Sequence, residues 1–109
     1  VGERYRRVAG WLECYEVMVL HFEDFILRRE QILEAMLSHL ETRGFQLSIP
    51  RQQAIRKLID AIDPKRSPTF RKGQVGDWRE YFTDHHKRLF IDVAGDLLIR
   101  LGYEQNNDW

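Results

Sequence analysis

The chain has 109 residues, which is enough for one domain or part of one and enough to bury a core without disulfides or metals. Apolar residues make up 43% of it and charged residues 31%, a balance that argues against a disordered chain. Because 17 basic side chains oppose 17 acidic ones, the whole molecule has no positive field to draw it onto nucleic acid, and we expect no nucleic-acid partner.

The cysteine content and the lengths of the apolar runs favour a cytoplasmic protein without a membrane partner. Cys14 is the only cysteine, which excludes an internal disulfide and favours a reducing compartment; we expect its side chain to be buried. The longest apolar run, residues 17–20, is far too short to span a bilayer, and no signal peptide opens the chain. The chain begins with Val1 rather than Met, which fits a fragment.

The first half of the chain predicts a helix, a strand and a second helix. Residues 3–12 place apolar side chains on one face of a short helix. Residues 16–22 predict a strand, because residues 17–20 are apolar at consecutive positions, as in a parallel sheet covered on both faces. Residues 28–43 form an amphipathic pattern that is typical of a helix, and Gly44 is suited to end it.

The second half predicts two more helices with a loop between them. One helix follows Ser48, a suitable N-cap, and ends before Pro64. Proline, serine and glycine then make residues 64–77 a loop. The last long helix is expected to start at Thr83 and to run without a break to Gly102.

The predicted strand has no obvious partner in this chain. A strand exposes a row of unpaired N–H and C=O groups, so a strand that is apolar on both faces needs a neighbour on each edge. Either residues 16–22 are not a strand, or their sheet partners lie on another segment or another chain. We favour the second alternative.

The loop before the last helix concentrates positive charge. Between Pro64 and Val75 there is no acidic residue, and the basic residues are Lys65, Arg66, Arg71 and Lys72. Arg71 can grip two phosphate oxygens with its planar fork of donors, and the N–H groups of Lys72 and Gly73 can add to the site. The alternative is a solvated basic loop with turn glycines. No Walker-type sequence is present, so triphosphate binding has no support.

The order Arg71-Lys72-Gly73-x-x-Gly76-Asp77-Trp78 resembles one family, the sulfotransferases that use 3'-phosphoadenosine-5'-phosphosulfate (PAPS). In that family this segment contacts the 3'-phosphate of the nucleotide. Arg79 and Phe82-Thr83 follow here as they do in the family. Residues 17–25 are similar to the family's core strand, and residues 101–104 are similar to the tail of bacterial members, so the likeness covers nearly the whole chain.

The resemblance implies a fold, an activity and a set of binding residues. Residues 1–109 would be the C-terminal segment of a single α/β sulfotransferase domain with a P-loop-like parallel sheet, mostly helical here with one core strand, and the N-terminal part with the 5'-phosphosulfate loop would be absent. The implied reaction moves a sulfuryl group from PAPS to a hydroxyl or amine of a small-molecule acceptor, without a metal. Arg71, Lys72 and Gly73 would bind the nucleotide's 3'-phosphate, and Phe22, which replaces the family's tyrosine, would pack near the adenine.

No catalytic residue is assigned to this chain, so we expect it to be inactive without the remainder of the domain. The histidines His21, His39, His85 and His86 match no catalytic or metal motif and are expected to be structural or exposed. Asp77 is a possible helix cap, and Trp11, Trp78 and Trp109 are expected to be packing residues. The alternative function is a stand-alone helical interaction module whose basic loop binds a protein or an anion.

Overall fold

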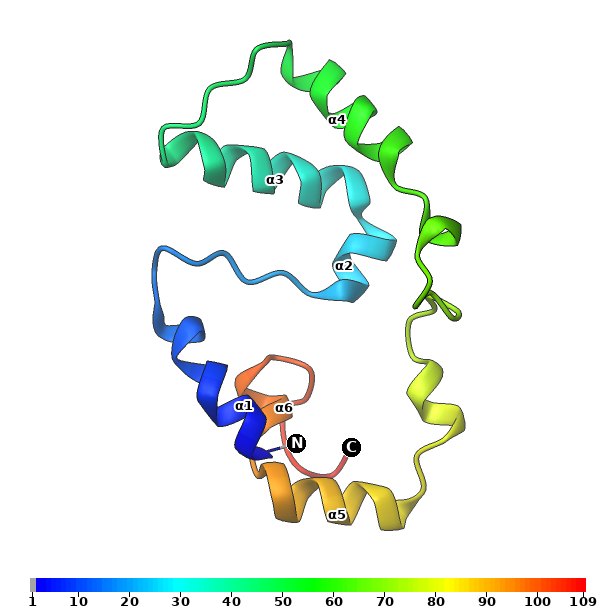
Figure 1. The fold of residues 1–109 in the computed structure, drawn as a ribbon. Helices are drawn as coiled ribbons and strands as arrows, with labels where there is room; N and C mark the ends of the chain where they lie inside the picture. Colours follow the sequence, from blue (N-terminus) through cyan, green and yellow to red (C-terminus); the bar gives the residue numbers. More distant parts are fainter. Residues whose placement is uncertain (1) are drawn as a thin grey trace. The chain divides into compact units, whose positions relative to one another are not determined.

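The computed structural model describes residues 2–109, which form helices and irregular segments (Figure 1). They divide into two compact units. One unit consists of residues 15–75, and the other joins the N-terminal residues up to Cys14 with the C-terminal stretch from Gly76 to Trp109. No helix among the described residues is both long enough and apolar enough to cross a membrane.

The unit of residues 15–75 is built on a pair of helices. Its elements are α2 (Phe22–Leu27), α3 (Arg29–Thr42), α4 (Arg51–Ala61) and the short 3-10 helix η2 (Pro64–Arg66). The helix predicted over 28–43 is confirmed by α3, and Gly44 follows it with a φ of 89°, a value that glycine adopts readily. Ser48 is not the cap of the next helix, because α4 begins after Pro50 without a side-chain cap.

The core of this unit lies between α3 and α4. Leu37 of α3 packs with Ala54 and Ile55 of α4, and Ile55 is only 2% exposed. Partly buried apolar side chains surround these three, namely Leu47, Ile49 and Ile59. Two of the six come from the connection between the helices, so the loop itself closes one side of the core.

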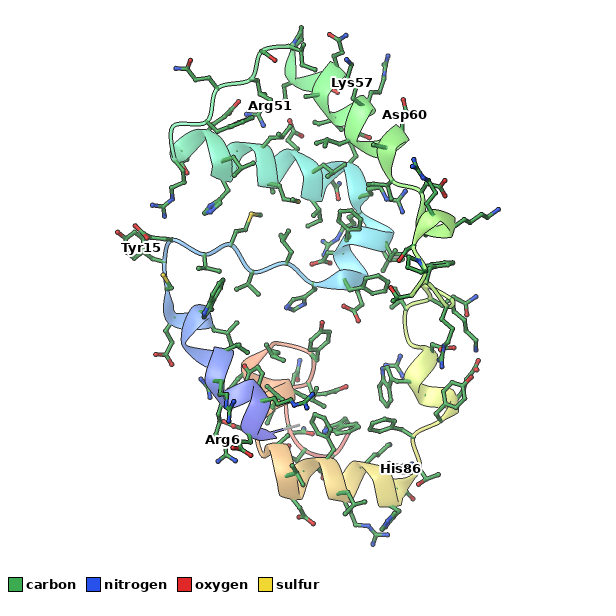
Figure 2. The ribbon with its side chains drawn as sticks, in the orientation of Figure 1. Arg6, Tyr15, Arg51, Lys57, Asp60 and His86 are labelled. Carbon is green, nitrogen blue, oxygen red and sulfur yellow. The ribbon has the colours of Figure 1, made fainter. Side chains whose placement is uncertain are left out.

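Arg51 links the start of α4 to the face of α3 (Figure 2). Its guanidinium donates to the backbone carbonyl of Glu34 at 3.3 Å and to the Ser38 hydroxyl at 3.1 Å. It also pairs with the carboxylate of Glu41. Because these three partners follow one another along α3, a single side chain fixes where α4 begins against that helix.

The strand predicted over 16–22 is wrong, and so is the α/β fold class with one core strand. Residues 17–21 have no regular structure, and the described residues 2–109 contain no strand. A strand depends on a hydrogen-bonded neighbour, which these residues do not supply. The segment is held instead through Glu16, whose carbonyl accepts from His39 Nε2 at 3.1 Å and whose carboxylate meets Arg43 at 3.2 Å.

A helix begins where the strand was expected to end. His21 is the N-cap of α2 in an extended conformation, and Phe22 is the first helical residue. Glu23 and Asp24 lie in the first turn, where negative charge interacts favourably with the helix dipole and stabilises the helix. Asp24 also pairs with Arg28 one turn later. The acidic pair therefore lies in the first turn of a helix.

The second unit contains the remaining helices. These are α1 (Gly2–Val8), the 3-10 helices η1 (Ala9–Glu13) and η3 (Asp77–Glu80), α5 (Asp84–Ala94) and α6 (Leu97–Arg100). Leu97 is buried here, and Arg100 of α6 meets Glu13 of η1 at 3.6 Å. The region predicted as one helix over 3–12 is helical, but it consists of α1 followed by the 3-10 helix η1. Cys14, which follows η1, is exposed, whereas a buried side chain was expected.

The predicted start of the last helix is confirmed, but its predicted length is wrong. Thr83 caps α5 in a reciprocal arrangement in which its hydroxyl accepts from the His86 N–H and the His86 ring accepts from the Thr83 N–H at 3.2 Å (Figure 2). The helix stops at Ala94, because Gly95 adopts a φ of 59° and a ψ of −123°. That conformation interrupts the helix before α6 begins at Leu97.

Shortening Ile55 tests the core between α3 and α4. We expect Ile55→Ala to lower the free energy of unfolding by about 2–5 kcal/mol and Ile55→Val by about 0.5–1.5 kcal/mol, from lost burial and the cavity left behind. Urea unfolding followed by far-UV circular dichroism measures both losses. Leu58→Ala is the matched control on α4, at a position that is 40% exposed, and should cost about 1 kcal/mol or less. Equal losses at the two positions would contradict the assigned core.

Candidate functional site

The basic loop is organised by short-range hydrogen bonds that start at the end of α4. The carboxylate of Asp63 accepts from the Lys65 N–H at 3.2 Å and so begins η2. The Ser67 carbonyl then accepts from the Phe70 N–H at 3.2 Å, which closes a turn. Within the turn the hydroxyls of Ser67 and Thr69 lie 3.1 Å apart. These contacts return the chain on itself just before Arg71.

Gly73 is required at its position for two reasons. Its φ of 62° lies in the left-handed region, which costs an ordinary residue about 1–2 kcal/mol. A Cβ atom at this position would also lie 2.8 Å from Cε2 of Phe70. The edge of the Phe70 ring therefore lies close to Gly73, and Arg71 and Lys72 are the two residues between them in the sequence.

The predicted phosphate-binding residues are exposed. Arg71, Lys72 and Gly73 all lie at exposed positions, as do the neighbouring cations Lys65 and Arg66. Both Arg71 and Lys72 also engage other groups of the protein. Four positive charges thus fall within twelve residues that contain no acid, and such a surface attracts a small anion.

The turn after the basic loop is set by a second glycine. Gly76 has a φ of 81° and is the N-cap of η3, so Asp77 is the first residue of that short helix and not its cap. The Gly76 carbonyl accepts from the Arg79 N–H at 3.1 Å. The boundary between the two units falls just before Gly76. The motif from Arg71 to Trp78 is therefore divided, with its basic half in one unit and its Gly-Asp-Trp half in the other.

Phe22 does not lie at the end of a strand, where an adenine-packing role was expected. It is the first residue of α2, in the same unit as Arg71, and its side chain is 49% exposed. Its aromatic face is thus accessible, but the strand that would have positioned it against a nucleotide is not there. The structure places the four predicted cofactor-binding residues in two separate segments, the start of α2 and the basic loop.

Two of the histidines, His39 and His86, have structural roles. His39 donates to the Glu16 carbonyl, and His86 completes the cap of α5. Within the described part of the chain, no three His, Cys, Asp or Glu side chains gather into a group suited to a metal ion.

Sequence reasoning missed an aromatic cluster in the unit that contains α5. Trp78 and Trp109, treated separately as packing residues, have ring centroids 5.7 Å apart. Phe82 lies 5.6 Å from Trp78, and Phe90 lies 5.9 Å from Trp109. The spacing of Trp78 and Phe82 indicates one helical turn, but nothing in the sequence connects Trp109 with them.

No model of a known protein family matches the sequence, and no solved structure matches the chain with significant similarity.

Replacing Gly73 tests how the loop holds its basic residues. We expect Gly73→Ala to displace the Phe70 ring, because the added methyl group meets that ring and alanine disfavours the φ of 62°. NMR signals of the Phe70 ring and of the Arg71 and Lys72 amides report the change. Gly44→Ala is the matched control, with a φ of 89° but open space around its Cβ, and it should alter only signals near the end of α3. Unchanged Phe70 signals in Gly73→Ala would refute the described packing.

Proposed function

We propose that this chain supplies the 3'-phosphate-binding loop of a sulfotransferase that uses PAPS. The observation that carries the proposal is the pair of consecutive exposed cations, Arg71 and Lys72, in a turn where the Phe70 ring approaches a left-handed Gly73. The likeness of the whole segment from Arg71 to Trp78 to the family's motif supports the same proposal. The proposed location is the cytoplasm.

The chemistry of a 3'-phosphate suits this loop. A phosphate monoester carries close to two negative charges near neutral pH and offers three strong acceptor oxygens. The Arg71 guanidinium can grip two of these oxygens, and the N–H groups of Lys72 and Gly73 can serve the third. Each charge-assisted hydrogen bond contributes about 1.5–3 kcal/mol, more than a neutral one. Phe22 offers an apolar face for the adenine, although it lacks the hydroxyl of a tyrosine.

The proposed reaction moves a sulfuryl group from the nucleotide to a small-molecule acceptor. A base takes the proton from the acceptor's hydroxyl or amine while the new bond to sulfur forms and the bond from sulfur to the 5'-phosphate oxygen breaks. Cationic groups stabilise the negative charge on the departing phosphate. We assign neither the base nor these cations to this chain. The remainder of the domain is therefore a required partner, and we expect the chain by itself to bind nucleotide without turnover.

A second candidate is a helical interaction module whose basic loop binds anions without regard to the nucleotide. The all-helical structure of the described residues favours it, because the proposed enzyme family carries its nucleotide on a sheet. Helix α5 also exposes Leu89 and Val93 one turn apart, with exposed fractions of 48% and 57%. Two large apolar side chains on one exposed helical face suit contact with another protein.

Titration with adenosine 3',5'-bisphosphate separates the two candidates. Under the sulfotransferase proposal the chain prefers this nucleotide to adenosine 5'-monophosphate, because only the former carries the 3'-phosphate. We expect Arg71→Ala to weaken binding of the bisphosphate by about 10- to 100-fold, which corresponds to the loss of one charge-assisted hydrogen bond. Isothermal titration calorimetry measures the dissociation constants.

The matched control is Arg56→Ala, which removes an exposed arginine of α4 in the same unit. It should leave the affinity for the bisphosphate within about twofold, the range of a distant surface charge screened by salt. Equal binding of the two nucleotides would favour the interaction module. Equal losses of bisphosphate affinity in Arg56→Ala and Arg71→Ala would mean that the nucleotide is attracted only by the overall positive charge of the surface. That result would refute the phosphate site.

A further inference from the structure

Three rings of the aromatic cluster, those of Trp78, Phe82 and Trp109, border a hollow of about 400 Å³ in the unit that contains α5. The residues that line the hollow are Trp78, Arg79, Phe82, Lys87, Glu104 and Trp109. They come from η3, from the cap and first turns of α5 and from the C-terminal tail. The volume falls within the range of small-molecule sites, which is about 300–1,000 Å³.

The rings of the cluster meet at steep angles. The indole planes of Trp78 and Trp109 are inclined by 81°, and the Phe82 ring is inclined to Trp78 by the same angle. Such edge-to-face contacts are the arrangement that aromatic rings prefer, and a further planar ring added to them gains similar contacts. The walls therefore favour a flat aromatic ligand over a branched aliphatic one.

Two cations lie over the indole faces at this hollow. The Arg79 guanidinium carbon is 4.8 Å from the centroid of Trp78, and Lys87 Nζ is 5.7 Å from the centroid of Trp109. Cation–π contact holds both side chains beside the cavity. Among the described residues that line the hollow, Glu104 is the one with a carboxylate side chain, so the lining side chains carry two positive charges and one negative charge, a net charge of about +1.

We propose that this hollow binds a planar aromatic monoanion, such as an aryl carboxylate or an aryl sulfonate. The ring of the ligand packs against Trp78, Phe82 and Trp109, and its anionic group pairs with Arg79 and Lys87. An aromatic cation is disfavoured, because the positions over the indole faces are already held by positive side chains and a third cation would be repelled. Glu104 limits the charge that the site accepts, so a monoanion fits better than a dianion.

The position of Lys87 depends on the cap of α5, which ties the hollow to the local fold. The Lys87 N–H donates to the Thr83 carbonyl at 3.0 Å, in the first turn that Thr83 and His86 cap. Phe82 directly precedes the cap residue Thr83, so the cap fixes the positions of both the Phe82 ring and Lys87 at the hollow. This site contains none of the proposed phosphate-binding residues and does not depend on the proposed function.

Titration of the whole chain with 2-naphthoate tests the proposal through the indole N–H signals of its three tryptophans. We expect the NMR signals of Trp78 and Trp109 to shift and that of Trp11, which is 66% exposed and does not line the hollow, to stay unchanged. 2-Naphthylmethylamine carries the opposite charge and cyclohexanecarboxylate lacks the aromatic ring, so both should bind at least about tenfold more weakly, as expected when a charge-assisted bond or the ring contacts are lost.

Charge variants give a readout that does not require the aromatic rings to be changed. Lys87→Gln should weaken 2-naphthoate binding by at least about tenfold, since it removes one charge-assisted bond. Glu104→Gln should strengthen it about two- to fivefold by removing the opposing charge. Lys57→Gln, at an exposed position on α4, is the matched control and should change nothing (Figure 2).

Several results would overturn this inference. One is the absence of shifts at Trp78 and Trp109 at millimolar 2-naphthoate, and another is an equal shift at Trp11. Tighter binding of the amine, with weakening in Glu104→Gln, would make the hollow a cation site. Equal binding of cyclohexanecarboxylate would remove the role of the rings, and equal effects of Lys57→Gln and Lys87→Gln would remove the role of the assigned cation.

Discussion

Burial of Ile55 against Leu37 is the interaction on which the unit of residues 15–75 depends. It holds α3 and α4 together, and both flanking segments are attached to that pair. The irregular segment before α2 is tied to α3 because Glu16 bonds to His39 and Arg43. On the other side, Asp63 starts η2 two residues after α4 ends, and the basic loop follows. The small core between α3 and α4 thus supports both the irregular segment before α2 and the basic loop.

The helices were predictable where their signals are local. Helix α3 is marked by an apolar repeat and by Gly44 after its end, and α5 is marked by Thr83 at its start. Each of these signals involves residues within one or two helical turns. Residues 17–20 were misread because an apolar run favours any buried environment, and only a distant partner decides whether it becomes a strand. Gly95 also misled, since a glycine inside an apolar helical repeat does not by itself show whether the helix passes through it or ends there.

For the candidate site too, sequence reasoning succeeded where the signals are local and failed where distant residues decide. Both glycines of the motif have a positive φ, and the approach of the Phe70 ring to Gly73 joins residues that are close in the sequence. The predicted loop over 64–77 is therefore correct for residues 67–76, whereas residues 64–66 form η2 and Asp77 begins η3. Sequence reasoning placed Phe22 wrongly, because that placement depended on a strand and on sheet neighbours. It missed the meeting of Trp78 with Trp109, which lie far apart along the chain.

The two candidate sites use cations in different physical settings. In the basic loop Arg71 and Lys72 lie at exposed positions, where water and salt weaken a single ion pair, so strong binding needs several donors on one phosphate. Beside the aromatic cluster Lys87 is half-buried, and an indole face holds it near the hollow before any ligand arrives. Less side-chain freedom is then lost on binding, and the ligand's ring displaces water from apolar surface. A weakly charged aromatic ligand therefore gains most at the hollow, whereas a highly charged phosphate gains most at the loop.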